Sequence, residues 1–186
     1  MSLNEIRLHI DAVDTQVKKL FLERMDCAQQ VAQEKAKTGG DVFVQSREDA
    51  IIAGRTADVA PERKAEYAYF LLLLMSISRR YQYGLLPAMR QQVLEDLSSR
   101  AGLELTAAHT GIEVSFTCAS GESKLALFAN MAALNGITVS NLTLTTEGEI
   151  QHVRATLQGN AGQENMQRLL CQLGKELNEF ALTGLC

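Results

Sequence analysis

Residues 3–37 read LNEIRLHIDAVDTQVKKLFLERMDCAQQVAQEKAK and contain neither glycine nor proline. Apolar side chains recur in alternating steps of four and three, at Ile6, Ile10, Val13, Val17, Leu20, Cys27 and Val31. This spacing predicts one helix with a single buried seam. At about 1.5 Å per residue the helix would be roughly 50 Å long, which is more than the other helices of such a domain can cover. We therefore expect it to pair with its copy in a second subunit.

Two cations occupy positions of that seam. Arg24 and Lys35 are eleven residues apart, and this spacing returns both side chains to nearly the same helix face. A buried cation without a partner is very costly, so an anion should meet them. The pattern predicts a site for a small, multiply charged anion. Taken alone, Arg24 could also pair with a core carboxylate, and Lys35 could be a favourable cation near a helix C-terminus.

The composition limits the classes of function. Lys and Arg total 18 against 22 Asp and Glu, a net charge of -4, so we expect no nucleic-acid partner. The apolar run 70–75 is too short to span a bilayer, and the N-terminus does not have the pattern of a signal peptide. Cys27 and Cys118 lie in apolar patterns and are expected as core residues in a reducing compartment. We expect a cytoplasmic protein without membrane contact or a bound metal.

The remaining elements predict an α+β chain of two domains. After a break at residues 38–41, helices are expected from Ser46 (an N-cap, with Asp49 completing a capping box) to about Gly54, from Pro61 to about Gly84, and from Pro87 to about Arg100. From Ile112 onward the period changes to alternation, and the order strand, helix, strand, strand, helix, strand is that of a ferredoxin-like domain. The expected division is 1–85, a helical connection over 86–110, and 111–186.

Further polar residues fall on inward-facing positions. Arg47 and Glu48 open the second helix, where backbone N–H groups favour anions, and Ser78 and Gln82 extend the apolar stripe of the third helix. Arg7 lies about a quarter turn from Arg24, so it could reach the pocket of a paired subunit but not easily that of its own. Each of these residues could instead be an ordinary surface residue. Arg79, Arg80 and Tyr81 are expected at the dimer surface or in helix packing.

This set resembles the all-helical class of chorismate mutases over residues 3–84. The resemblance rests on seven positions: Arg7, Arg24, Lys35, Arg47, Glu48, Ser78 and Gln82. That family forms an intertwined dimer whose sites borrow an arginine from the partner subunit, in agreement with the geometry inferred for Arg7. Many members carry Asp four residues before the Glu of the second helix, where this chain has Val44. If a backbone group makes that contact, Val suffices.

The resemblance implies an isomerase of aromatic amino-acid biosynthesis that converts chorismate to prephenate without a cofactor. It implies that Arg24, with Ser78, binds the ring carboxylate, and that the partner subunit's Arg7, with Lys35, binds the enolpyruvyl carboxylate. Glu48 would accept a hydrogen bond from the ring hydroxyl. Lys35 and Gln82 would donate to the ether oxygen, and Arg47 would support the positive field. The reaction is intramolecular, so the site must hold a reactive conformer and stabilise charge on the ether oxygen. The alternative is an inactive dimeric relative that senses a metabolite of the same pathway.

The second half resembles an ACT-type regulatory domain, a ferredoxin-like module. The support is its predicted topology, the helix expected from Glu122 to Asn135, and Gly136 before the next strand. The resemblance implies an aromatic amino acid as the effector. A structural or dimerising role for this domain is equally compatible with the sequence.

Overall fold

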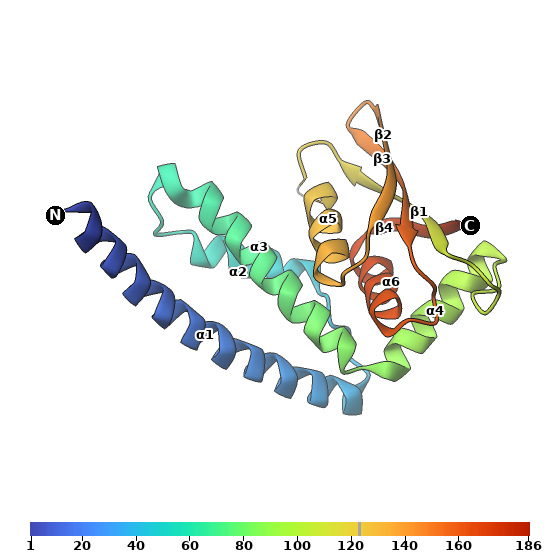
Figure 1. Ribbon diagram of the computed structural model, residues 1–186, viewed down its shortest axis with the longest axis horizontal. Helices are drawn as coiled ribbons and strands as arrows, with labels where there is room; N and C mark the ends of the chain where they lie inside the picture. The colour runs from blue at the N-terminus through green and yellow to red at the C-terminus, as the bar shows by residue number, and fades with distance from the viewer. Residues whose placement is uncertain (123) are drawn as a thin grey trace.

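The computed structural model describes residues 1–122 and 124–186 and shows a helical domain followed by a sheet domain (Figure 1). The predicted α+β two-domain architecture is confirmed. The helical domain consists of α1 (Leu3–Thr38), α2 (Gln45–Arg55) and α3 (Pro61–Gly84), and α4 (Pro87–Ala101) follows it. The sheet domain consists of β1 (Gly111–Ala119), α5 (Lys124–Leu134), β2 (Val139–Glu147), β3 (Ile150–Gln158), α6 (Glu164–Glu176) and β4 (Asn178–Leu185).

Helix α1 is a single long helix, as its sequence predicts. It begins with a capping box in which Ser2 and Glu5 bond each other's backbone N–H, and it ends at Gly39, whose φ of 72° is left-handed. Its N-terminal half extends away from the rest of the chain (Figure 1). Its second half packs against α3 with Ala28 and Ala32 buried. The small side chains of this ridge let the two helices approach closely.

The expectation that Cys27 is a core residue is therefore wrong. Cys27 and its seam neighbour Val31 are exposed, because α1 meets α3 along the adjacent ridge of Ala28 and Ala32. The seam residues toward the N-terminus are exposed in the single chain as well; Ile10 is 51% and Leu20 63% exposed. Cys118 is buried in β1 as expected.

Prolines and a terminal glycine mark the following helices correctly. Helices α3 and α4 begin at Pro61 and Pro87, and α3 ends at Gly84. The predicted N-cap of α2 is wrong: the helix already begins at Gln45, so Ser46 lies inside it, and among the described residues no side chain caps it. The side chain of Gln45 instead donates to Asp49 at 2.7 Å, one turn further on.

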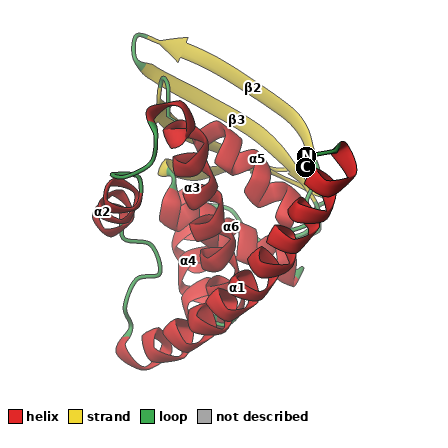
Figure 2. Cartoon of the chain, turned by 90° about the vertical axis from the view of Figure 1, so that its left-hand side faces the viewer, coloured by secondary structure: helices red, strands yellow, loops and turns green. Residues whose placement is uncertain are grey.

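The sheet has the order β2-β3-β1-β4 with every neighbouring pair antiparallel, which is the ferredoxin-like arrangement. Helices α5 and α6 cover one face of it, and the other face is open (Figure 2). An apolar core lies between these two helices and the sheet, and in it the ring centroids of Phe116 and Phe128 are 5.2 Å apart. Helix α5 ends before Gly136, which has a φ of 66°. Its predicted start near Glu122 adjoins residue 123, which lies outside the described residues.

Helix α4 joins the two domains and packs along α6 and β4. Its Leu97 is 1% exposed and belongs to the core of the sheet domain. Helix α6 also contacts α3, so the two domains share an interface. No helix in the described part of the chain combines the length and the apolar character needed to cross a membrane.

Candidate active site

A cavity of about 260 Å³ lies among α1, α2 and α3. Six of the seven polar residues singled out in the sequence line it: Arg24, Lys35, Arg47, Glu48, Ser78 and Gln82. The seventh, Arg7, is exposed near the start of α1, roughly 25 Å of helix rise from Arg24. The single chain thus brings together residues from three helices and leaves Arg7 outside.

Arg24 and Ser78 connect α1 to α3 at one wall of the cavity. The guanidinium Nη1 of Arg24 donates to the hydroxyl of Ser78, and to the carbonyl oxygen of Leu74 at 3.3 Å. Ser78 is buried, and its hydroxyl donates to the same Leu74 carbonyl at 3.0 Å. Burial lowers the pKa of Arg24, an effect opposed by the carboxylate of Glu48. Arg24 nevertheless stays charged, because an arginine does not deprotonate in proteins.

Lys35 connects the end of α1 to the loop over residues 39–44. Its ammonium donates to the backbone carbonyls of Asp41 and Val42, at 3.2 Å for the latter. Burial lowers the pKa of Lys35, and the nearby charge of Arg47 lowers it further. Backbone carbonyls thus hold this loop to Lys35, while Val44 lines the cavity without contributing a charge.

Gln82 lies at the cavity, on the α3 face that carries Ser78 one turn earlier. It is only 7% exposed, and its amide oxygen has no hydrogen-bond partner in the part of the chain that the structure describes. A buried polar atom without a partner costs about 1–3 kcal/mol. The unpartnered atom is an acceptor, so it is the amide oxygen that is free to accept a hydrogen bond from a ligand.

Arg79 is the cavity residue whose importance the sequence did not reveal. It is 4% exposed, and its guanidinium bonds Glu48 of α2 and Glu176 of α6. The sequence contained a signal, because Arg79 continues a ladder of four-residue steps through the buried Leu71 and Met75. This position is inside the helix packing and not on an outer surface.

The charges around the cavity suit an anion with more than one charge. Four cationic side chains line it; Arg79 is already paired with Glu48 and Glu176, which leaves Arg24, Lys35 and Arg47 to meet an anion. Ser78 and Gln82 add neutral hydrogen-bonding groups, and Val31, Ile51 and Met75 add apolar surface. Such a site can bind two carboxylates and donate hydrogen bonds without any step that forms a covalent bond to the protein.

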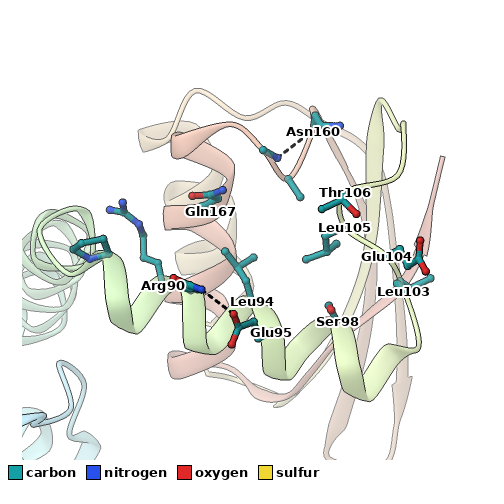
Figure 3. Close-up of a pocket in the computed structure, with 14 residues that line it drawn as sticks. Arg90, Leu94, Glu95, Ser98, Leu103, Glu104, Leu105, Thr106, Asn160 and Gln167 are labelled. Atoms are coloured by element: carbon teal, nitrogen blue, oxygen red, sulfur yellow. Dashed lines mark hydrogen bonds between the residues drawn. The ribbon is translucent and has the colours of Figure 1, made fainter.

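A larger cavity, of about 810 Å³, lies between α4, residues 103–106 and the start of α6 (Figure 3). Arg90 is the one cation among its described lining residues. Its guanidinium donates to the carbonyls of Tyr83 and Gly84, at 3.1 and 2.6 Å. Size alone therefore does not identify the site for an anion, and the smaller cavity is the better candidate. Among the described residues there is also no cluster of side chains that could hold a metal ion.

Residues 6–83 match the family model described as chorismate mutase type II. The match begins in the first turns of α1, ends in the last turn of α3, and includes all seven polar positions. The similarity to this family covers the helical domain, less than half of the chain, and the sheet domain that follows is compatible with an ACT-like module. Comparison of the chain with curated proteins and with solved structures gave no match.

Proposed function

We propose that this helical domain of the chorismate mutase type II family rearranges chorismate to prephenate. The observation that supports the proposal best is the convergence of three cations, Arg24, Lys35 and Arg47, with Glu48, Ser78 and Gln82 on one cavity from three helices. Chorismate is a dianion with a hydroxyl and an ether oxygen. The cavity offers cations, an acceptor and neutral donors, which match these groups in chemical kind.

The cations divide between the two carboxylates of the substrate. Arg24, oriented by its bond to Ser78, binds the ring carboxylate. Lys35 and the partner subunit's Arg7 bind the enolpyruvyl carboxylate. Clamping both ends favours the folded conformer in which the reacting carbons lie close together, and such orientation supplies much of the rate of an intramolecular reaction.

The remaining polar groups act at the bond that breaks. Lys35 and Gln82 donate hydrogen bonds to the ether oxygen, which gains negative charge in the transition state. Glu48 accepts a hydrogen bond from the ring hydroxyl, and Arg47 strengthens the positive field near Lys35. The substrate supplies every bond that forms or breaks, so the proposed mechanism has no role for a cofactor or a metal.

The proposed active unit is a homodimer in which each subunit lends Arg7 to the other. Support comes from the N-terminal half of α1, which extends away from its own domain and exposes Ile6, Ile10, Val13, Val17 and Leu20 along one seam. A contiguous apolar face of this kind marks an interaction surface. A second α1 would cover this seam and would carry its own Arg7 toward the neighbouring cavity.

We further propose that the sheet domain regulates the enzyme by binding an aromatic amino acid. Support comes from a crevice of about 530 Å³ between the domains. It combines the apolar side chains of Phe43, Leu72 and Met131 with the charged Lys124 and Glu122. A zwitterion with an apolar side chain suits that mixture.

We also propose a cytoplasmic location, which the free thiols of the chain support. The proposed domain division is 1–85 for the mutase domain, 86–110 for the connection and 111–186 for the sheet domain.

The decisive experiment follows the absorbance of chorismate with the purified protein. Turnover to prephenate supports the enzyme. A folded dimer that leaves chorismate unchanged would overturn the proposal and favour the inactive, metabolite-sensing alternative. Thermal shifts and inhibition by phenylalanine, tyrosine and tryptophan test regulation separately. If none of the three changes the melting temperature or the rate, the sheet domain has a structural role.

A further inference from the structure

We propose that Glu176, which belongs to the sheet domain, positions Glu48 of the mutase cavity by acting through Arg79. The inference rests on the proposed function, because it concerns the placement of a residue of that site. It makes a carboxylate of the sheet domain part of the machinery that orients the substrate.

The pair of Arg79 and Glu176 is the most completely buried ion pair in the described chain. Nε and Nη2 of Arg79 donate to the two carboxylate oxygens of Glu176, at 2.7 Å each. The side chains are 5% and 2% exposed. Two parallel bonds of this kind fix the plane of the guanidinium as well as its place. Helix α6 therefore determines how Arg79 of α3 is oriented.

Arg79 has one further nitrogen, Nη1, and this atom donates to Oε1 of Glu48. The ring of Phe43 lies over the guanidinium at 4.9 Å and limits its movement on that side. Glu176 takes the Nε–Nη2 edge of the guanidinium, and Glu48 receives one bond, from Nη1 to Oε1. Its second oxygen remains available to accept a hydrogen bond in the cavity.

Glu48 and Arg79 also form the wall between the mutase cavity and the interdomain crevice. Both residues line both spaces, whereas Glu176 lines the crevice alone. Glu176 is thus placed to influence the cavity without touching a ligand in it. This makes it a positioning residue and not a catalytic one.

The loss of Glu176 should change the geometry at Glu48. A buried guanidinium without its main partner is costly, so Arg79 would turn its bidentate edge to the one carboxylate left. Glu48 would then accept two bonds from Arg79 and move away from the ring hydroxyl. A displacement of about 1 Å at a reacting site can cost about 100-fold in rate.

The first test compares Glu176→Gln with Ser76→Ala in steady-state kinetics with chorismate. Glutamine keeps the size of the side chain but removes one acceptor and the charge. We expect kcat to fall about 10- to 100-fold with a smaller change in KM, at a temperature where circular dichroism shows the variant folded. Ser76→Ala removes a different buried contact between α3 and α6, the 3.3 Å bond from Gln172, and should keep the wild-type kcat.

The second test is a double-mutant cycle of Arg79→Met and Glu176→Met. If Glu176 acts through Arg79, Glu176→Met lowers kcat in the wild-type background and has no further effect on kcat beside Arg79→Met. A merely structural role predicts another result: the double variant, whose buried pair is replaced by apolar volume, would recover activity together with thermal stability.

The outcomes separate the two proposals. A wild-type protein that turns over chorismate while Glu176→Gln keeps full kcat overturns the positioning role alone. Independent losses in the cycle overturn it as well. A wild-type protein without turnover overturns the proposed function and this inference with it.

Discussion

Arg24 of α1 donates a hydrogen bond to the hydroxyl of Ser78 of α3, across 54 positions of the chain. The bond connects a cation that interrupts the apolar seam of one helix to a polar residue that interrupts the apolar stripe of another. Both interruptions are thereby explained at a single point, the wall of the cavity. The same bond orients the guanidinium to which the proposed mechanism assigns the ring carboxylate.

Lys35→Ala should reduce kcat by about 100- to 1000-fold, because it removes the donor that we propose for the developing charge on the ether oxygen. Lys37→Ala is the matched control. Lys37 lies two residues further on, is exposed and pairs with Glu34 on the surface. Steady-state kinetics of both variants test the assignment, and equal losses in the two would contradict it.

The pH profile should fall on the alkaline side earlier than an ordinary lysine would allow. Burial and Arg47 lower the pKa of Lys35, so the free enzyme loses this ammonium as pH rises through the lowered value, and kcat/KM decreases. Lys35→Arg should move that limb to higher pH, whatever its absolute rate. An unmoved limb would assign the titration to another group.

The free energy of unfolding should change with pH in the direction opposite to kcat/KM. Between its lowered folded pKa and its normal unfolded pKa, the unfolded chain binds more protons, so the free energy of unfolding rises with pH in that window. Urea titrations across this range should show the free energy of unfolding of the wild type rising relative to that of Lys35→Met as pH increases.

Gln82→Glu should make activity depend on acid, in addition to the alkaline limb that Lys35 produces. An amide donates a hydrogen bond without being protonated, whereas a carboxyl group donates only in its acid form. We expect kcat to rise as pH falls through the pKa of the new side chain. Activity of this variant that is constant with pH would show that residue 82 does not donate to the ether oxygen.

Mixed dimers test the partner subunit's Arg7. Arg7→Ala and Lys35→Ala homodimers should both be nearly inactive. After mixing and exchange, a hybrid dimer carries one site with both residues intact, so activity should return toward a fraction of wild type. The control uses Lys18→Ala in place of Arg7→Ala. Lys18 is an exposed cation on the same helix, so the Lys18→Ala homodimer should retain activity. Inactive mixtures whose exchange is verified would contradict the assignment of Arg7.

Leu170→Ala should destabilise the sheet domain by about 2–5 kcal/mol, because Leu170 is fully buried in its core and the substitution leaves a cavity. Leu144→Ala is the control, since Leu144 lies on β2 and is 43% exposed. It should change the free energy of unfolding by no more than about 0.5 kcal/mol. Urea unfolding followed by circular dichroism measures both.

Local signals predicted most of the helix ends. Pro61, Pro87 and Gly84 mark helix ends, because their effects act within one turn of backbone. Ser46 misled the prediction of α2, since a capping pattern specifies compatible residues but not which of several adjacent residues starts the helix. Cys27 misled the prediction of the core, since two neighbouring ridges of one long helix were both compatible with burial.

The amino-acid sequence was enough to predict the two-domain organisation, the succession of strands and helices along the second domain, and the group of polar residues on inward faces. Periodicity and spacing carry that information, because they reflect which side of a helix or strand each residue occupies. The pairing of Arg79 with Glu176, 97 positions apart, was decided only when α6 packed against α3. A contact between distant segments depends on the relative placement of whole elements, and no local pattern encodes it.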